Sequence, residues 1–366
     1  MMENKNILYI GPYIENSVRG RAALNNIKYL EKMGHSLTIK PIYIEPNNSY
    51  DFSLYEDKSL EKLESNYLDK YDICIQHCDI LGYVNNRAFD KNIGIFDFIN
   101  YPSQSIINSR LNILDKIIVN SLDKKLSLQD VLNEKIYSKV FYCPQYADLD
   151  EWRDIQLSPL SWKDKNIYYF YSELEFTDMY DWKKLVYVYI TNFAYKNAQL
   201  ILKTSLIKTD EDVAFVNKTI HDIAINANVS PEKTNLPKII AAEYSDQGMW
   251  NLYNAMDCFI DVSRGSNFNY TNLKAAFLNK DIIVNKRTSS STMFDNLSLV
   301  EGLPIQVDEQ YYDDTINFTM YDYAATMDTN SLKEIMNKSY LNRNPDKNRY
   351  EQQLQGYDFT NINKLL

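Results

Sequence analysis

The feature that most constrains the fold is an alternation of short apolar runs with amphipathic segments along almost the whole chain. The run 6–10 ends at Gly11-Pro12, and after a polar loop Leu24, Ile27 and Leu30 recur on one helical face. A glycine then precedes a second apolar run, 36–42. Short runs are typical of strands, spacing of three to four residues is typical of helices, and glycine often ends a helix. The first forty residues therefore predict strand, loop, helix, strand.

The same alternation continues to about residue 284, in two series. Strands that alternate with helices form a parallel sheet covered on both faces. We therefore predict an α/β fold with two doubly wound, Rossmann-like domains facing a cleft. The expected strands of the first domain are 6–10, 36–42, 71–76, 92–96, 116–120 and 139–142, and those of the second are 167–171, 199–203, 238–241, 257–262 and 281–284.

A chain of 366 residues suits two domains of ordinary size. The stretch 157–166 contains Pro159 and lacks periodicity, as expected of a linker. We predict an N-terminal domain at 1–156, the linker at 157–166 and a C-terminal domain at 167–344. The polar tail 345–366 is expected to form a last helix that packs back across the first domain.

Charge and composition disfavour several classes of function. The formal charge is −10 without a basic block, which argues against nucleic acid as the main partner. The apolar runs are too short to span a membrane, and the N-terminus has no signal-peptide core, so we expect a cytoplasmic protein. The four cysteines lack zinc-knuckle spacing and are expected to be buried free thiols, and three scattered histidines do not indicate a metal site.

One segment carries a family resemblance. The run from Met249 to Gly265 reads MWNLYNAMDCFIDVSRG, and it is followed by a loop at 266–270, a helix at 271–278 and a turn and strand at 279–284. This order resembles the second domain of retaining glycosyltransferases of family four (glycosyl transferases group 1), which have the GT-B architecture. Their helix contains Leu-Tyr, then an Asp, then a buried strand that ends in Ser-Arg-Gly.

The first half adds three similar segments in the family's order. They are the opening ILYIGP at 7–12 with the helix end LEKMGHSL at 30–37, the unit NILDKIIVNS at 112–121, and the closing VFYCP at 140–144. The resemblance implies a nucleotide-sugar, UDP- or GDP-linked, as substrate, with no other cofactor and a transfer that needs no metal.

The resemblance implies that the donor binds the second domain, and physical reasoning agrees with it. Parallel sheets bind ligands at the carboxyl ends of their strands, and a helix that begins near Thr271 would present N–H groups to a diphosphate. The same loop could also be a plain strand-to-helix connection. The donor-binding candidates are Gly265, Ser266, Asn267, Phe268, Asn269, Thr271, Lys274, Lys286, Arg287 and Thr288.

Two departures from the family concern charge. Its active members carry two glutamates across this loop and helix, and the matching positions here are Ser266, which we retain as a catalytic candidate, and Lys274. An Arg-Lys pair that the family offers to the donor phosphates is replaced by Met179 and Tyr180. Lys274, expected on the first helical turn, either supplies the missing positive charge or is a solvated surface lysine.

The first domain offers a smaller set of candidates. His77 follows the strand 71–76 at its carboxyl end, where family members place a histidine near the sugar, so it is a catalytic candidate. A polar core histidine is the alternative. Gly11, Arg19 and Gly20 lie in or beside the loop that enters the first helix, and they are candidates for contact with the acceptor or a phosphate.

Two functions remain open. The leading interpretation is a retaining, metal-independent glycosyltransferase that moves a sugar from a nucleotide diphosphate to an unidentified glycan, lipid-linked glycan or protein. The alternative is a catalytically inactive homologue that binds sugars or nucleotides, or that supports an active partner enzyme; the sequence is also compatible with a homo-oligomer. A nucleotide-sugar epimerase shares this architecture, but no residues select for it.

Overall fold

The computed structural model of the chain describes residues 3–15, 18–42, 58–96, 104–177, 180–204, 209–242, 244–264, 269–305, 324–343 and 349–366. These residues form two compact units. Unit 1 contains the chain up to Leu149 together with the C-terminal segment Gly356–Leu366, and unit 2 contains Asp150–Asp308 and Tyr321–Gln355.

Unit 1 is built on a six-stranded sheet in which every described pair is parallel. The strand order is β2-β1-β3-β4-β5-β6, so the chain reverses direction across the sheet after β2. All six predicted strands are confirmed. They are β1 (Asn6–Gly11), β2 (Ser36–Pro41), β3 (Ile73–Gln76), β4 (Lys91–Ile95), β5 (Lys116–Val119) and β6 (Val140–Tyr142).

The helices of unit 1 follow the expected local signals. Helix α1 ends before Gly34, whose φ of +90° lies in the left-handed region that favours glycine. Ser121 and Asn133 cap the starts of two short helices with their side-chain oxygens. The helices are α1 (Val18–Lys32), α2 (Lys58–Ser65), α3 (Gln104–Leu111), α4 (Leu122–Ser127), α5 (Glu134–Tyr137) and α6 (Leu149–Arg153), the last of which crosses the boundary between the units.

Unit 2 repeats this plan with the order β12-β11-β10-β7-β8-β9, again with parallel pairs. The five predicted strands are confirmed, and three further strands, β12 to β14, were not predicted. The strands are β7 (Tyr168–Glu173), β8 (Ala198–Lys203), β9 (Lys238–Ile240), β10 (Cys258–Asp261), β11 (Asp281–Asn285) and β12 (Ser298–Val300), with the antiparallel pair β13 (Gly302–Ile305) and β14 (Ala324–Met327).

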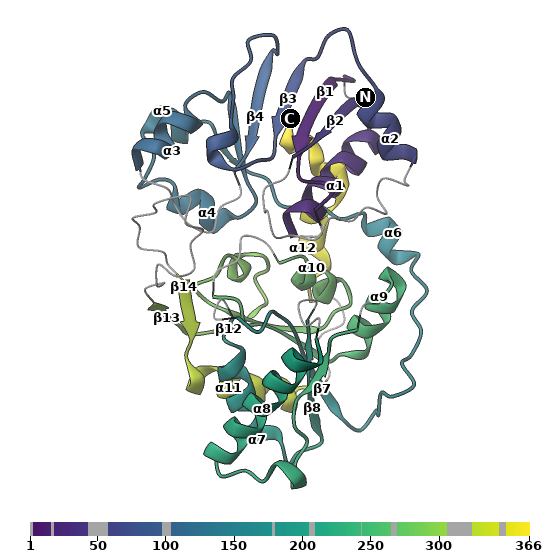
Figure 1. Cartoon of the computed structure of the whole chain (residues 1–366), viewed down its shortest axis with the longest axis vertical. Coiled ribbons are helices and arrows are strands. Elements are labelled where there is room, and N and C mark those ends of the chain that lie inside the picture. The colour runs from purple at the N-terminus through teal and green to yellow at the C-terminus, as the bar shows by residue number, and fades with distance from the viewer. Residues whose placement is uncertain are drawn as a thin grey trace. The chain divides into compact units, whose positions relative to one another are not determined.

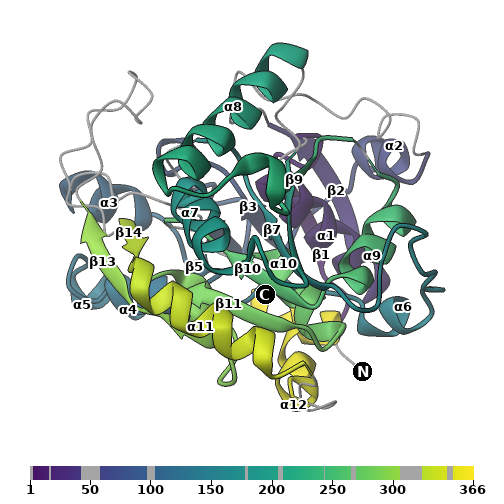
Figure 2. The ribbon, with the colours of Figure 1, turned by 90° about the horizontal axis from the view of Figure 1, so that it is seen from below.

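Helices cover both faces of this sheet. Figure 2 shows α8, α7 and α11 side by side, and their apolar residues share one buried core with β7, β8 and β10. Helix α9 lies on the other side, near α10. The helices are α7 (Trp182–Phe193), α8 (Asp210–Asn226), α9 (Asp246–Ala255), α10 (Tyr270–Phe277), α11 (Thr329–Leu341) and α12 (Glu351–Leu354).

The C-terminal segment belongs to the core of unit 1. Phe359, Ile362 and Leu365 are buried in one cluster with residues of β1, α1 and β3. Figure 1 shows this yellow segment beside the purple α1. Its main element is a 3₁₀ helix at Phe359–Leu365. The expected linker 157–166 contains no helix or strand, and it lies within unit 2.

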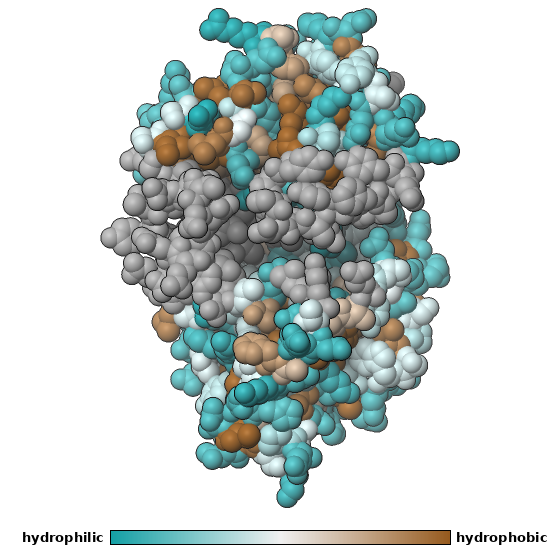
Figure 3. Space-filling model, viewed as in Figure 1, coloured by the Kyte–Doolittle hydropathy of each residue, from teal (hydrophilic) through white to brown (hydrophobic). Residues whose placement is uncertain are grey.

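The surface and the cysteines add two observations. Hydrophilic side chains cover much of the face in Figure 3, with smaller apolar areas between them. Among the described residues, none of the helices combines the length and apolarity that crossing a membrane requires. All four cysteines are free; Cys78 is half-buried and the other three are buried.

Candidate functional site

In unit 1 the predicted residues Gly11 and His77 end neighbouring strands. Gly11 is the last residue of β1, and His77 directly follows β3. A Cβ atom on Gly11 would lie 2.8 Å from the Tyr9 ring and 3.3 Å from the His77 Cβ. The missing side chain therefore allows Tyr9 and His77 to pack together at this edge of the sheet.

His77 is held by a buried hydrogen bond. Its Nδ1 lies 3.1 Å from the Tyr9 hydroxyl, and the Asn26 amide donates to that hydroxyl at 3.3 Å. The His77 side chain is almost fully buried, and its Nε2 has no partner among the described residues. Burial, together with the nearby Arg19 charge, lowers the pKa of His77 to about 3, so the imidazole is neutral near pH 7.

Arg19 and Gly20 lie in the first turn of α1. The Arg19 Nη1 is 3.2 Å from the Oδ1 of Asp79, which lies two residues beyond His77. In the same region, burial raises the pKa of the Tyr9 hydroxyl. A Cβ atom on Gly20 would lie 2.0 Å from the backbone oxygen of Glu15, so only glycine fits there. The structure thus brings His77, Arg19 and Gly11 together at one edge of unit 1.

In unit 2 the corresponding strand end carries a carboxylate that the sequence analysis did not select. Glu173 is the last residue of β7, and its Oε2 accepts hydrogen bonds from the Tyr253 hydroxyl at 3.0 Å and from the Thr271 hydroxyl at 3.1 Å. Thr271 is the second residue of α10. The protein therefore places its own negative charge beside the helix start that was expected to hold a diphosphate.

The start of α10 is also capped from within the chain. The Asn269 Oδ1 accepts hydrogen bonds from the backbone N–H groups of Thr271 at 2.9 Å and Asn272 at 3.3 Å. Asn269 thus acts as an N-cap. Two of the N–H groups that a helix start offers to an anion are engaged by this side chain.

Lys274 does not lie on the first turn of α10, as the sequence analysis expected. The helix begins at Tyr270, so Lys274 is its fifth residue and lies in its last turn. The Nζ lies 5.2 to 5.4 Å from the ring centroids of Trp250, Tyr253 and Tyr270. Three aromatic faces stabilise an ammonium group by cation–π attraction.

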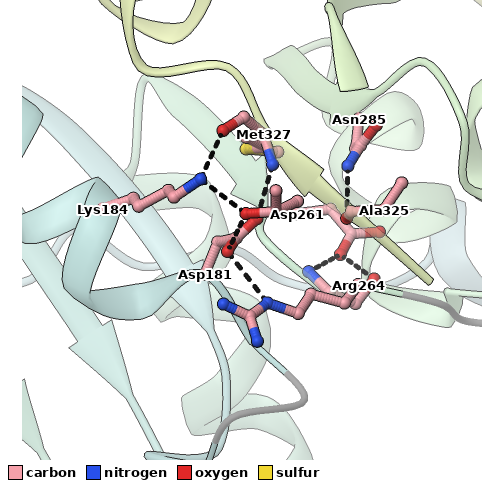
Figure 4. A network of polar contacts seen from close by, with 9 residues as sticks. Asp181, Lys184, Asp261, Arg264, Asn285, Ala325 and Met327 are labelled. Carbon is pink, nitrogen blue, oxygen red and sulfur yellow. Dashed lines mark hydrogen bonds and ion pairs between the residues drawn. The ribbon is translucent and has the colours of Figure 1, made fainter. Parts of the chain in front are cut away.

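Two buried aspartates of unit 2 accept hydrogen bonds from several segments. Figure 4 shows Asp181, just before α7, accepting hydrogen bonds from the Arg264 Nε at 2.9 Å and from the Met327 N–H at 2.6 Å. The Thr326 hydroxyl donates to Asp181 at 2.7 Å. Asp261, the last residue of β10, accepts from side chains on three segments, namely Ser263, Asn272 and Ser290.

The turn after β11 is tied to neighbouring segments. The Lys286 Nζ pairs with Glu301 at 2.9 Å, and the Arg287 Nε donates to the Gly302 oxygen at 2.8 Å. Thr288 is buried and donates to the Asn285 oxygen at 2.9 Å. Lys286 and Arg287 remain exposed. In the described part of the chain, no three His, Cys, Asp or Glu side chains form a group that could hold a metal ion.

Some expectations fall on residues that are not described. Gly265, Ser266, Asn267, Phe268 and Met179 lie outside the described residues. Tyr180 is described, and it forms an isolated antiparallel bridge with Ser263.

The residues that the sequence analysis missed are Tyr9, Asn26, Glu173, Asp181 and Arg264. For Glu173 the sequence did contain a signal, because an acidic residue two positions beyond a predicted strand lies at the edge where parallel sheets bind ligands. Tyr9 and Asp181 gave no such signal, because their partners are distant in sequence.

Comparisons with known proteins now define the fold. No protein-family model matches the chain, and no curated protein matches it. Solved structures do match over almost the full length. Anabaena HepE in complex with UDP and glucose aligns with a TM-score of 0.60 at 11% identity, covering 99% of this chain and 98% of that chain.

Two sugar-phosphate synthases give similar values. Sucrose-phosphate synthase of Thermosynechococcus elongatus aligns with a TM-score of 0.61 at 12% identity, covering 98% of this chain and 96% of that one. The trehalose-6-phosphate synthase OtsA aligns with a TM-score of 0.61 at 10% identity, covering 98% and 97%. The chain has the GT-B glycosyltransferase fold, with two Rossmann-like α/β units.

Proposed function

We propose that this protein is a glycosyltransferase that moves a sugar from a nucleotide diphosphate-sugar to an acceptor. The observation that carries the proposal is the match of the chain, over 99% of its length, to structures of the same fold solved with UDP and glucose or with UDP-glucose. Polar groups at the carboxyl ends of strands in both units support it, because parallel sheets bind ligands at that edge.

The proposal includes a retaining, metal-independent transfer. The bond between the sugar C1 and the diphosphate oxygen breaks, and the acceptor oxygen bonds to C1 on the same face. The acceptor proton passes to the leaving phosphate oxygen, so that no protein base is required. The donor-side residues of this proposal are Gly265, Ser266, Asn267, Phe268, Asn269, Thr271, Lys274, Lys286, Arg287 and Thr288; those of unit 1 are His77, Gly11, Arg19 and Gly20.

His77 is the group in unit 1 best suited to contact a sugar. It is neutral, buried and fixed by Tyr9, and its Nε2 is without a protein partner among the described residues. A fixed neutral imidazole can form one hydrogen bond with a ligand oxygen, and because the imidazole carries no charge, no charged group has to be desolvated.

A second candidate function is a nucleotide- or sugar-binding homologue without catalysis. The observation that favours it is the Glu173 carboxylate beside the start of α10, together with the Asn269 cap on the same helix. A negative charge at this position opposes a diphosphate, and stabilisation of the leaving group is normally one of the larger contributions to such catalysis.

A donor panel distinguishes the two functions. Purified protein is incubated with UDP-glucose, GDP-mannose and ADP-glucose while thermal unfolding and donor hydrolysis are followed. For the enzyme we expect one donor at ten times its Kd to raise the unfolding temperature by about 3–6 °C and to be hydrolysed slowly. A rise without hydrolysis supports the binding homologue, and no response to any donor contradicts both.

Two histidine variants provide the matched control. We expect His77→Ala to reduce donor hydrolysis at least about tenfold, the effect of losing one good hydrogen bond. His221→Ala changes an exposed histidine of α8 and should leave hydrolysis unchanged. Equal rates in both variants would remove His77 from the proposed site.

A further inference from the structure

Three side chains in unit 1 form a chain of hydrogen bonds that ends at a buried nitrogen. The Asn26 Nδ2 lies 3.3 Å from the Tyr9 hydroxyl oxygen, which lies 3.1 Å from the His77 Nδ1. Asn26 lies on α1, Tyr9 on β1, and His77 directly follows β3. Strands β1 and β3 are neighbours in the sheet (Figure 1). Among the described residues, the far nitrogen of the imidazole, Nε2, has no hydrogen-bond partner.

The direction of each hydrogen bond follows from the groups involved. The amide nitrogen of Asn26 can only donate, so the Tyr9 oxygen accepts from it. Because Asn26 and His77 are the only described partners of the Tyr9 hydroxyl, its single O–H proton has an acceptor only at the His77 Nδ1. A nitrogen that accepts this proton carries none of its own. In a neutral imidazole the remaining proton must therefore reside on Nε2.

We infer that Asn26 and Tyr9 are positioning residues that fix His77 as an Nε2–H donor, so that the ligand group His77 contacts must be a hydrogen-bond acceptor. A hydroxyl oxygen, a carbonyl oxygen or a phosphate oxygen meets this requirement, whereas an ammonium or amide N–H group does not. The part that concerns the ligand rests on the proposed function; the part that concerns the tautomer does not.

Burial and packing support this inference. His77 and Tyr9 are both almost fully buried, and the Tyr9 ring packs so close to Gly11 that a Cβ atom there would lie 2.8 Å from it. A buried N–H without a partner costs folding free energy, and such groups are rarer in proteins than unpaired carbonyl oxygens. The Nε2–H of His77 lies at the edge of the sheet where ligands bind, so a ligand oxygen can provide the missing hydrogen-bond partner.

The tautomer can be measured directly because the chain has only three histidines. Protein with ¹⁵N-labelled histidine gives imidazole nitrogen shifts that separate Nε2–H from Nδ1–H, and His35→Gln and His221→Gln variants assign His77 by elimination. We expect a single Nε2–H form in the wild type. An Nδ1–H form, or a rapid mixture of the two, overturns the inference.

Two variants test the roles of the positioning residues. Asn26→Asp presents only oxygens, so it would accept the Tyr9 proton and reverse the direction of both hydrogen bonds. We then expect His77 to change to the Nδ1–H form. Tyr9→Phe removes the link, and we expect a mixture of tautomers. Tyr83→Phe is the control. It deletes the hydroxyl of another fully buried tyrosine of unit 1, which donates a hydrogen bond to the Ile95 oxygen, and it should leave the tautomer of His77 unchanged. An unchanged tautomer in both Asn26→Asp and Tyr9→Phe contradicts the inference.

UDP-glucose serves as the probe for the ligand. We expect Tyr9→Phe and Asn26→Asp to weaken its binding about threefold to tenfold, while Tyr83→Phe leaves it unchanged. Unchanged binding in both positioning variants, while the wild type binds, contradicts a contact between the Nε2–H and the ligand. If the wild type fails to bind any nucleotide-sugar, the proposed function fails, and the nitrogen shifts still decide the tautomer.

Discussion

At the residue scale, Glu173 has the largest expected effect on a ligand. Its carboxylate accepts hydrogen bonds from the hydroxyls of Tyr253 and Thr271, so both its position and its orientation are fixed. A diphosphate at the start of α10 would meet this charge at short range. Two like charges about 4 Å apart near a protein surface repel by a few kcal/mol.

We therefore predict that Glu173→Gln increases the affinity for UDP at least about fivefold, or about 1 kcal/mol. The amide oxygen of glutamine can still accept from both hydroxyls, so the local structure should be retained. Isothermal titration of UDP measures the change. Glu211→Gln is the control, because it removes an exposed carboxylate at the start of α8 and alters the net charge equally. Weaker binding in Glu173→Gln would mean that the carboxylate accepts hydrogen bonds from the ligand instead.

Lys274 shows that a residue type does not reveal its surroundings. From the sequence, a lysine near the start of a helix had two interpretations, a phosphate-binding cation or a solvated lysine. In the structure its ammonium lies among three aromatic rings contributed by α9 and α10. The phosphate-binding role stays a proposal, and it now requires that the ligand compete with these rings for the ammonium.

At the scale of elements, Asp181 joins three segments of unit 2. Its side chain is fully buried and accepts hydrogen bonds from Arg264 after β10 and from Thr326 and Met327 in β14. It precedes α7 without capping that helix, because both of its oxygens are directed to these partners. One carboxylate thus fixes where β14 and the start of α7 lie relative to β10.

We predict that Asp181→Asn destabilises unit 2 by about 2–4 kcal/mol, because the amide removes the charge that Arg264 pairs with and places a donor opposite the Met327 N–H. Urea unfolding monitored by hydrogen exchange in β10 measures the change. Asp328→Asn is the matched control. Asp328 caps α11, where asparagine caps about equally well, so the change should stay below about 0.5 kcal/mol. Similar losses in both variants would contradict a special role for Asp181.

At the scale of the whole molecule, the last residues of the chain stabilise the first unit. The segment Gly356–Leu366 belongs to unit 1, although the chain forms unit 2 before it returns. Backbone hydrogen bonds join Ala147 to Tyr357 at 2.9 Å and Phe359 to Ala147 at 2.8 Å, and the Lys116 Nζ donates to the Lys364 oxygen at 2.7 Å. Unit 1 is therefore complete only when the C-terminus is in place.

We predict that Ile362→Ala lowers the stability of unit 1 by about 2–5 kcal/mol, the usual cost of a large cavity in a core, and leaves unit 2 nearly unchanged. Ile362 is fully buried and lies more than 200 residues beyond Leu149, where the N-terminal part of its unit ends. Hydrogen exchange of the β1 and β10 amides reports the two units separately. Leu341→Ala, at a residue that is 76% exposed, should change neither. Equal loss of protection in both strands would mean that the units unfold as one.

The sequence by itself determined the class of fold, because secondary structure follows from local patterns. All eleven strands expected from apolar runs are present, and the helix expected at 271–278 is present at Tyr270–Phe277. The three missed strands are short, and two of them form a separate antiparallel pair. Alternation of strand and helix leaves few arrangements other than two parallel, doubly wound sheets.

Only the tertiary structure decided which polar groups meet. Glu173 lies 98 residues from Thr271, and Tyr9 lies 68 residues from His77, so no local pattern links them. Each pair is created by the order of strands in a sheet and by the helix that packs behind it. Apolar runs determine that a strand forms and which face is buried, but a hydrogen bond between distant side chains depends on positions that are set only when the whole core has packed.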